Sequence, residues 1–398
     1  MSNADFMEKL LDGVGVEWKT LSAVVKTVTA PSKLNSQAYR TVGKLPIIDQ
    51  GIEFIAGYTD EDITPVEVGE YVIFGDHSEH IKYVDFPFIQ GADGLKILRP
   101  ISDNAKYIYH AFLNFYKKEL SYKRHWSTAQ QTLLPIPCPE NPKKSLEIQA
   151  EIVRILDAFT ALTTELTTEL TSRKKQYNYY RDQLLSFEDG DVEWKTLGDV
   201  TKKWYSGGTP TAGRSEYYDG GDIPWLRTQE VKFTDINNTD VKITKAALDK
   251  TAAKWIPANC VIVAISGATA GRSAINKIPL TTNQHCGCLE IDSSKALYRY
   301  VFHWVSFNYE NLKAQGQGAR GDLNSTIIKN FRLPIPYADT PHKSLAEQAR
   351  IVAILDKFDA LTTSLTEGLP REIELRQKQY EYYRDLLLSF PKPEAVDA

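Results

Sequence analysis

The sequence is poor in cysteine, in methionine and in net positive charge. Its 398 residues include four cysteines and two methionines, and the formal net charge is −4. Cysteines this few and this irregularly spaced do not make a disulfide framework. No apolar run reaches the roughly 18 residues that a membrane span needs, and the N-terminus has no apolar signal-peptide core. We therefore expect a cytoplasmic protein without a membrane partner.

Motifs for metal binding and catalysis are also scarce. Residues 285–288 read His-Cys-Gly-Cys, but no second ligand pair follows at zinc spacing. His77-x-x-His80 lacks a third ligand, so no metal site is predicted. Residues 208–215 resemble a phosphate-binding loop in which Arg214 replaces the lysine. No catalytic residue is predicted, and the enzymatic alternative is a DNA methyltransferase or nuclease whose active site is not recognisable.

The chain does contain a long internal repeat. Gln-Ala-x-Ile-Val-x-Ile-Leu-Asp occurs at residues 149–157 and 348–356, each time after Leu-Pro-Ile-Pro and before Tyr-Arg-Asp-x-Leu-Leu-Ser-Phe. Val-Glu-Trp-Lys-Thr-Leu occupies residues 16–21 and 192–197. The sequences that these repeats enclose do not resemble each other. A duplicated frame around two different inserts predicts one scaffold that presents two specificities.

The repeats predict two long amphipathic helices, over residues 145–187 and 344–390. Their apolar residues recur at steps of mostly 4 and 3, which is coiled-coil spacing. Ser145 and Ser344 are the expected N-caps. The positions expected to face a partner helix are Ile152, Ile155, Phe159, Leu162, Leu166, Leu170, Ile351, Ile354, Phe358, Leu361 and Leu365.

The two predicted helices differ in length. The second copy has four extra residues near Pro370, which should kink or break it. The first contains Thr-Thr-Glu-Leu twice, over residues 163–170, and each unit adds about 6 Å of helix. Because an apolar stripe needs a partner, we expect the two helices to pack antiparallel. The alternative is two separate helices, each covering its own domain.

The inserts predict mixed α/β domains, because each combines short strand-like runs with turns and one helical stretch. The expected fold class is α/β (mixed): two globular domains separated by two long antiparallel coiled-coil helices. The predicted boundaries are 1–143, 144–190, 191–343 and 344–398. Residues 6–13 resemble the tail of the repeated helix. The repeat is therefore expected to be circular and pseudo-two-fold, with the chain ends close together.

Taken together, these motifs resemble the specificity (S) subunits of type I restriction–modification systems over essentially the whole chain. Gly-Gly-Thr-Pro at residues 207–210, followed by Gly-Asp-Ile-Pro-Trp at 221–225, is similar to the start of a target recognition domain. The tandem Thr-Thr-Glu-Leu resembles the variable tetrapeptide of the type IC branch.

The resemblance implies recognition without catalysis. Each insert would read one half of an asymmetric bipartite site in double-stranded DNA, while the helices set the spacer and bind two methyltransferase (M) subunits. Restriction (R) subunits would complete the complex. S-adenosylmethionine, ATP and Mg²⁺ would be held by these partners and no cofactor by this chain. A coiled-coil scaffold that does not touch DNA is a further alternative.

Candidate DNA contacts come from basic, amide and aromatic side chains. A basic cluster interleaved with aromatic residues, such as the one near residue 120, is typical of nucleic-acid binding. Arginine and glutamine suit guanine and adenine edges, whereas lysine mostly contacts phosphate. The candidates are Lys117, Lys118, Lys123, Arg124, Trp126, Arg214, Arg227, Gln229, Arg272, Gln284 and Arg320.

Overall fold

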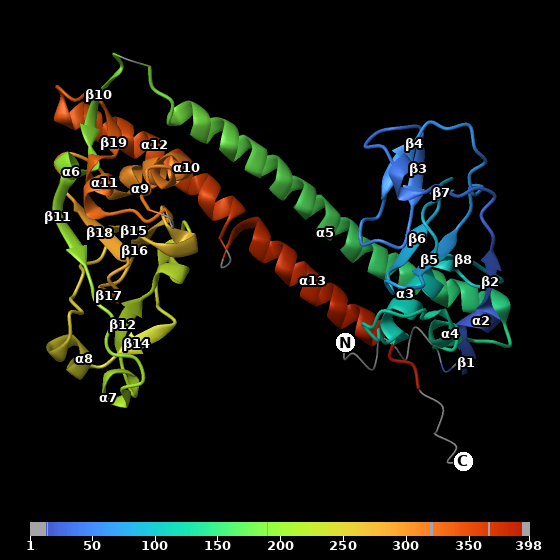
Figure 1. The fold of residues 1–398 in the computed structure, drawn as a ribbon. Coiled ribbons are helices and arrows are strands. Elements are labelled where there is room, and N and C mark those ends of the chain that lie inside the picture. Colours follow the sequence, from blue (N-terminus) through green and yellow to red (C-terminus); the bar gives the residue numbers. More distant parts are fainter. Residues whose placement is uncertain (1–12, 14, 189, 319–320, 365–366, 392–398) are drawn as a thin grey trace. The chain divides into compact units, whose positions relative to one another are not determined.

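The chain forms two compact units (Figure 1). The computed structural model describes residues 13, 15–188, 190–318, 321–364 and 367–391. Unit 1 lies within residues 1–167 and 372–398, and unit 2 spans Thr168–Arg371. Each unit therefore contains one insert together with one part of each long-helix region.

Unit 1 is built on a four-stranded antiparallel sheet, ordered β2-β8-β5-β6, and a three-stranded sheet, ordered β4-β3-β7. Its strands are β1 (Val16–Thr20), β2 (Val25–Val28), β3 (Leu45–Ile48), β4 (Gly57–Thr59), β5 (Tyr71–Gly75), β6 (Ile81–Val84), β7 (Ile89–Gln90), β8 (Leu95–Pro100) and β9 (Leu133–Pro137). Its short helices are α2 (Leu21–Val24), η1 (Ser36–Ala38), α3 (Ala105–Phe115) and α4 (Trp126–Ala129).

Unit 2 contains a five-stranded sheet, ordered β11-β18-β15-β16-β13, and a three-stranded sheet, ordered β14-β12-β17. Its strands are β10 (Val192–Thr196), β11 (Thr201–Ser206), β12 (Ile223–Leu226), β13 (Asp235–Ile236), β14 (Val241–Ile243), β15 (Val261–Ala264), β16 (Ser273–Asn276), β17 (Thr281–Thr282), β18 (Cys286–Ile291) and β19 (Arg332–Pro336). Its short helices are α6 (Leu197–Val200), α7 (Ser215–Tyr218), η2 (Thr228–Glu230), α8 (Lys245–Lys250), η3 (Gly267–Thr269), α9 (Tyr298–Phe307), α10 (Tyr309–Lys313) and α11 (Ser325–Asn330).

The two inserts share one topology although their sequences differ. The order β11-β18-β15-β16 repeats β2-β8-β5-β6, with the same antiparallel pairings. The order β14-β12-β17 repeats β4-β3-β7, including one parallel pair in each sheet. Unit 2 adds the strand β13 to the larger sheet. Sequence comparison misses this likeness because a strand needs apolar residues on its buried face and not particular ones.

The repeated tryptophan motif forms the same strand pair in both units. β1 pairs with β9 and β10 with β19, so that Trp18 lies opposite Pro135 and Trp194 opposite Pro334. These tryptophans therefore belong to the frame. The indole Nε1 of Trp18 donates a hydrogen bond of 2.7 Å to the carbonyl oxygen of Pro391, which brings residues near the two chain ends together. The predicted helix tail at residues 6–12 lies outside the described residues.

The long helices begin earlier than predicted. α5 spans Pro142–Leu184 and α12 spans Pro341–Thr362. The prediction that Ser145 and Ser344 are N-caps is wrong, because both are buried within the first turns. Each helix begins instead at a proline, whose fixed φ and missing N–H suit the first helical position.

The predicted break in the second long helix is confirmed. α12 ends at Thr362, and α13 begins at Gly368 and ends at Leu387. Pro370 lies in the first turn of α13, where no N–H is needed. The interruption therefore precedes the proline. The predicted packing residue Leu365 lies outside the described residues.

The two helical regions pack antiparallel within each unit, as predicted. In unit 1 the ring of Phe159 on α5 stacks on Tyr383 of α13, with 5.1 Å between centroids. In unit 2 the rings of Tyr177 and Tyr180 on α5 lie 6.0 Å and 5.6 Å from that of Phe358 on α12. The predicted apolar stripe thus faces its partner helix in both units.

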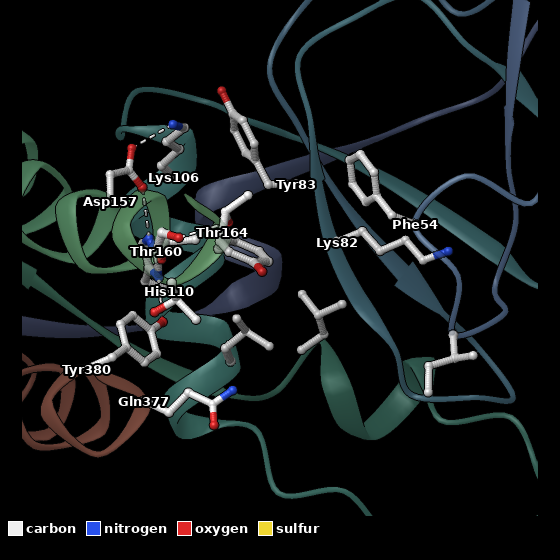
Figure 2. Close-up of a pocket in the computed structure, with 15 residues that line it drawn as sticks. Phe54, Lys82, Tyr83, Lys106, His110, Asp157, Thr160, Thr164, Gln377 and Tyr380 are labelled. Carbon is white, nitrogen blue, oxygen red and sulfur yellow. Dashed lines mark hydrogen bonds and ion pairs between the residues drawn. The ribbon is translucent and has the colours of Figure 1, made fainter. Parts of the chain in front are cut away.

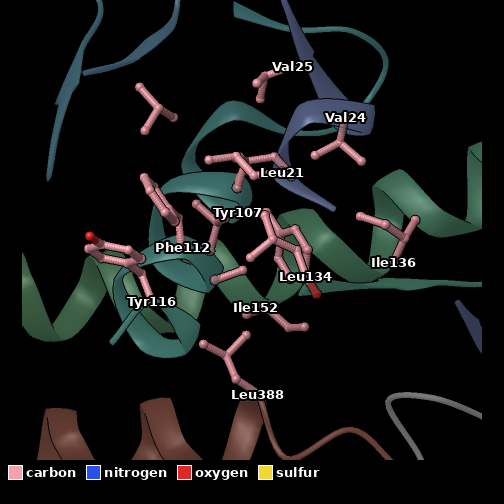
Figure 3. Packing of buried hydrophobic residues seen from close by; sticks show 14 of the residues in the cluster. Leu21, Val24, Val25, Tyr107, Phe112, Tyr116, Leu134, Ile136, Ile152 and Leu388 are labelled. Atoms are coloured by element: carbon pink, nitrogen blue, oxygen red, sulfur yellow. The ribbon is translucent and has the colours of Figure 1, made fainter. Parts of the chain in front are cut away.

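The N-terminal part of α5 is buried beneath the insert of unit 1. In unit 1, Ile152 of α5 packs with Leu21, Tyr107 and Leu134 of the insert and with Leu388 after α13 (Figure 3).

No helix among the described residues has the length and apolar character required to cross a membrane.

Replacing Ile152 with alanine should destabilise unit 1 by about 2–5 kcal/mol, because the side chain is fully buried and its removal leaves a cavity. Urea-induced unfolding measures the effect. The matched variant Arg154→Ala, two residues further along α5 on its exposed face, removes only a surface ion pair with Glu151 and should cost about 0–1 kcal/mol. Equal losses in both variants would contradict this account of the core.

Candidate nucleic-acid interface

The long helices α5 and α12 each hold one insert through a buried glutamine. The side-chain Oε1 of Gln149 accepts a hydrogen bond of 2.8 Å from the backbone N–H of Asn104, directly before α3. Gln348 accepts one of 2.9 Å from the N–H of Leu297, directly before α9. Both glutamines are 0% exposed. Because a buried amide must be paired, these bonds fix where α3 and α9 begin on the scaffold.

A tyrosine in each recognition domain joins its helix to the frame. The hydroxyl of Tyr107 donates 2.6 Å to the carbonyl oxygen of Pro135, and that of Tyr300 donates 2.9 Å to the carbonyl oxygen of Pro334. Both prolines belong to the repeated Leu-Pro-Ile-Pro strands. Equivalent hydrogen bonds therefore dock α3 and α9 against the frame.

An ionic cluster completes the docking in unit 1. Asp157 of α5 lies 2.6 Å from Lys106 Nζ and 3.5 Å from His110 Nε2 (Figure 2). The other ring nitrogen of His110, Nδ1, lies 3.3 Å from the hydroxyl of Tyr380 on α13. Burial lowers the pKa of His110 despite the neighbouring carboxylate of Asp157. These residues form one wall of a hollow of about 670 Å³ whose opposite wall includes Phe54 and Lys82.

An equivalent cluster occurs in unit 2. Asp356 of α12 lies 2.7 Å from Arg299 Nε and 2.7 Å from His303 Nε2. Burial would raise the pKa of Asp356, but hydrogen bonds from His303 and Arg299 outweigh burial and lower that pKa. With Asp359, these groups include three ligand atoms within 4.8 Å of one another. Because the guanidinium already occupies Asp356, we assign the cluster to docking.

This repeat was not predicted, although its signal is present in the sequence. Residues 106–110 read Lys-Tyr-Ile-Tyr-His and residues 299–303 read Arg-Tyr-Val-Phe-His. The pattern is short and lies inside inserts that otherwise differ. Its meaning becomes clear only when each Lys or Arg and each His meets the aspartate that ends the repeated scaffold motif.

A buried carboxylate holds the basic loop of unit 1, residues 117–124, in place. Glu79, in the β5–β6 turn, accepts hydrogen bonds from the hydroxyl of Tyr116 and from the N–H groups of Glu119 and Leu120, at 2.6–2.8 Å. Burial would raise the pKa of Glu79, but these hydrogen bonds lower it overall. The loop is thus fixed by a charge that the protein itself buries.

A second carboxylate fixes the end of this loop. Asp76 Oδ1 accepts hydrogen bonds of 3.0 Å and 2.8 Å from the N–H groups of His125 and Trp126. The ring of Trp126 is partly buried, with its centroid 6.1 Å from that of Phe74. Trp126 therefore anchors the basic loop to the core.

The remaining basic candidates of unit 1 are exposed. Lys117, Lys118, Lys123 and Arg124 all lie on the loop that Glu79 and Asp76 fix. Lys123 forms an ion pair with Glu119, four residues earlier in the same loop. Because this loop is already ordered, its four cations can contact phosphates without the entropic cost of ordering the loop on binding.

Unit 2 places several of its candidates at the corresponding sheet end. Arg272 lies in the β15–β16 turn, which is equivalent to the β5–β6 turn of unit 1, and Gln284 lies between β17 and β18. β12 and β17 are parallel neighbours, so Gln229, which follows β12, leaves the small sheet at the same edge as Gln284. Arg320, between α10 and α11, lies outside the described residues.

The other two arginine candidates are engaged within the fold. Arg227 is part of the turn after β12, where its guanidinium lies 3.6 Å from Glu230 and 3.8 Å from Asp240. Arg214 precedes α7, which lies near the start of β12 and so at the end opposite to Gln229, and its guanidinium lies 3.1 Å from Glu216. The structure therefore does not bring Arg214 together with Arg272 and Gln284.

The Gly-Gly-Thr-Pro segment packs against the strand that leads to Gln284. A Cβ atom on Gly207 would overlap the carbonyl oxygen of Thr282, which explains the glycine. The indole Nε1 of Trp225 donates 3.1 Å to the carbonyl oxygen of Gly208. Thr209 Oγ1 then donates 2.6 Å to Gln284 Oε1. The motif thus positions an exposed threonine beside a candidate DNA contact.

The Cys-Gly-Cys part of the His-Cys-Gly-Cys motif lies in strand β18, and His285 directly precedes that strand. Cys286 and Cys288 lie in β18 and are buried. Burial raises the pKa of the Cys286 thiol to about 12, so it is protonated at neutral pH. A protonated thiol is a poor metal ligand.

Replacing Glu79 with glutamine should open the basic loop, because an amide cannot accept all the hydrogen bonds that the carboxylate receives. The free energy of local opening should fall by about 1–3 kcal/mol. When local opening limits cleavage, the rate of trypsin cleavage after Lys117, Lys118, Lys123 or Arg124 should therefore rise by about 5- to 150-fold. Glu67→Gln, at an exposed site in the same unit, is the control. Unchanged cleavage in Glu79→Gln would contradict the anchoring role.

Comparison with known proteins agrees with this architecture. The family described as the type I restriction modification DNA specificity domain matches residues 14–173 and 190–375. The type I restriction enzyme EcoR124I/EcoR124II specificity subunit of Escherichia coli is 44% identical over 413 aligned residues, covering 100% of both chains. The EcoprrI specificity subunit of Escherichia coli is 30% identical and covers 92% of this chain and 93% of its own.

A solved structure shows the same fold. The crystal structure of a type I restriction–modification S subunit from M. genitalium aligns with a TM-score of 0.64 at 13% identity, covering 96% of this chain and 98% of that one. The family matches twice, once over each recognition domain with its adjoining helix. The chain therefore belongs to the type I restriction modification DNA specificity family and is a specificity subunit.

Proposed function

We propose that each recognition domain of this specificity subunit reads one half of an asymmetric, bipartite site in double-stranded DNA. The observation that carries the proposal is the shared topology of two inserts whose surfaces differ. One fold used twice keeps the docking to the scaffold constant, while unlike loops at the sheet ends give each domain its own set of contacts. Two different surfaces read two different half-sites.

The proposed contacts are the candidates at these sheet ends whose side chains are exposed or partly exposed. In unit 1 they are Lys117, Lys118, Lys123 and Arg124, which suit phosphate. In unit 2 they are Arg272, Gln229 and Gln284, whose groups suit base edges, and Arg320 is retained from its sequence. Trp126 and Arg227 hold these surfaces in place without contacting DNA themselves. Arg214 contributes at most a DNA contact that is separate from the others.

We propose further that the helices bind methyltransferase subunits, two in the complete complex, and that restriction subunits join them. Exposed aromatic side chains support a partner surface, because Tyr179 is 59% and Tyr382 50% exposed at equivalent positions of the repeat. S-adenosylmethionine, ATP and Mg²⁺ would be held by the partners. This chain would contribute recognition and no chemistry of its own.

Methylation assays decide between recognition and catalysis. The chain should transfer no methyl group from S-adenosylmethionine by itself and should direct methylation to a bipartite site when methyltransferase subunits are added. Activity of the isolated chain would support an enzyme instead. Absence of any protected bipartite site in footprints of the complex would leave only a scaffold.

Substituting Lys118 with alanine should weaken binding of the complex to every DNA sequence to a similar degree. Loss of one phosphate contact should reduce the slope of log Kobs against log salt concentration by about 1. Lys143→Ala, an exposed lysine at the start of α5, should leave the slope unchanged. A change in base preference without a change in slope would contradict a phosphate role for Lys118.

Deleting one tetrapeptide, residues 167–170, should shorten the spacer and leave both half-site sequences unchanged. The deletion removes four helical residues, or about 6 Å, at the point where unit 1 ends and unit 2 begins. Genome-wide mapping of methylated adenines in cells that carry the variant complex measures both features. Altered half-sites with an unchanged spacer would refute the assignment of the tetrapeptide to spacing.

A further inference from the structure

A chain of hydrogen bonds crosses the sheet end of unit 2 and joins three loops. Thr209 Oγ1 lies 2.6 Å from Gln284 Oε1, and Gln284 Nε2 lies 3.2 Å from His285 Nε2. His285 Nδ1 lies 2.7 Å from Ser266 Oγ. Thr209, Gln284 and His285 are exposed. The four side chains come from the Gly-Gly-Thr-Pro segment, the β17–β18 turn and the residues before η3.

With the amide of Gln284 oriented as in the structure, these hydrogen bonds run in one direction. The threonine hydroxyl donates to Gln284 Oε1, so the amide nitrogen faces His285. A contact between two nitrogens needs one donor and one acceptor, so Gln284 Nε2 donates and His285 Nε2 accepts. The proton of the neutral imidazole is then on Nδ1 and is donated to Ser266. The reverse network, in which His285 Nε2–H donates to the amide oxygen and Ser266 donates to Nδ1, requires both the rotated amide and the other tautomer of His285.

These bonds leave half of the amide of Gln284 available. Oε1 can accept one more hydrogen bond and Nε2 can donate one more. An acceptor and a donor on one planar group match the N6 amino group and N7 of adenine in the major groove. Guanine presents two acceptors there, so its O6 would face the oxygen of Gln284.

We propose that Gln284 is a specificity-determining residue that selects adenine at one position of the half-site read by unit 2. Thr209 and His285 are positioning residues that hold its amide in the adenine-reading orientation. The proposal rests on the proposed function of the domain. It also gives the exposed threonine of the Gly-Gly-Thr-Pro segment a role in choosing a base.

Fixing the amide before DNA arrives favours selectivity, because a flexible glutamine can rotate to suit a wrong base. The side chain is also ordered in advance, which removes part of the entropic cost of binding. Gln229 is a useful contrast, since among the described residues its exposed amide has no hydrogen-bonding partner in unit 2. A glutamine of that kind would adapt to either orientation.

The test uses the complex with its methyltransferase subunits in cells without restriction activity, followed by mapping of methylated adenines. Wild type should give a bipartite motif with an adenine in the half-site that unit 2 reads. Gln284→Ala should lower discrimination at one A·T pair of that half by about 5- to 150-fold and leave the other half unchanged. Competition binding with duplexes altered at that pair measures the factor.

Two threonine variants separate positioning from folding. Thr209→Val keeps the shape of the side chain but removes its hydroxyl. The variant should discriminate less between bases at the position that Gln284 reads. Its affinity for the correct DNA site should fall by a smaller factor than this discrimination. Thr209→Ser restores the hydroxyl and should restore selectivity. Thermal unfolding of each purified complex checks that the variants are folded.

The outcomes distinguish this inference from the proposed function. Failure of wild type to give any bipartite motif would overturn the proposed function, and this inference with it. A bipartite motif whose base preferences are unchanged in Gln284→Ala would overturn only the role of Gln284. Relaxation in Gln284→Ala with full selectivity in Thr209→Val would overturn the positioning role of Thr209.

Discussion

The structure depends on a buried amide that joins each scaffold helix to its recognition domain. Gln149 and Gln348 have no access to solvent, and each accepts a hydrogen bond from the backbone N–H of the residue directly before α3 or α9, respectively. An unpaired buried amide is costly, so this geometry tolerates little variation. Around it, the tyrosine–proline bonds and the aspartate clusters add further fixed points, and together they make both domains dock in the same way.

Constant docking allows the rest of each domain to vary. The loops at the sheet ends take no part in these bonds and have different anchors in the two units. In unit 1 the buried Glu79 fixes a basic loop, whereas in unit 2 an exposed chain from Thr209 to Ser266 joins three turns. One surface presents cations and the other an oriented amide. Different chemistry on the same fold is what two unlike half-sites require.

Part of the fold was predictable because it repeats. The apolar stripes, the break near Pro370 and the antiparallel pairing follow from spacing and from the need to cover an apolar face. The helix starts were predicted wrongly, because Ser145 and Ser344 have the side chains of good N-caps but are instead buried beside Gln149 and Gln348. A capping preference is a local effect, and tertiary packing overrides it.

Individual contacts were less predictable than the fold. Lys117 and Lys118 were identified by charge clustering, and their loop position supports that choice. Charge alone could not separate Gln284, which is oriented by two neighbours, from Arg227, whose guanidinium is engaged by Glu230. Those neighbours are distant in sequence or differ in kind, so no spacing rule identifies them.

The sequence by itself determined the duplication, the two helices and the membership of a family, because repeated apolar spacing and repeated motifs are legible along the chain. Only the tertiary structure decided that the unlike inserts share one topology, and that Glu79, Thr209 and His285 orient the side chains at the sheet ends. The reason is physical: a strand requires only a buried apolar face, and a hydrogen-bonding partner is chosen by distance in space.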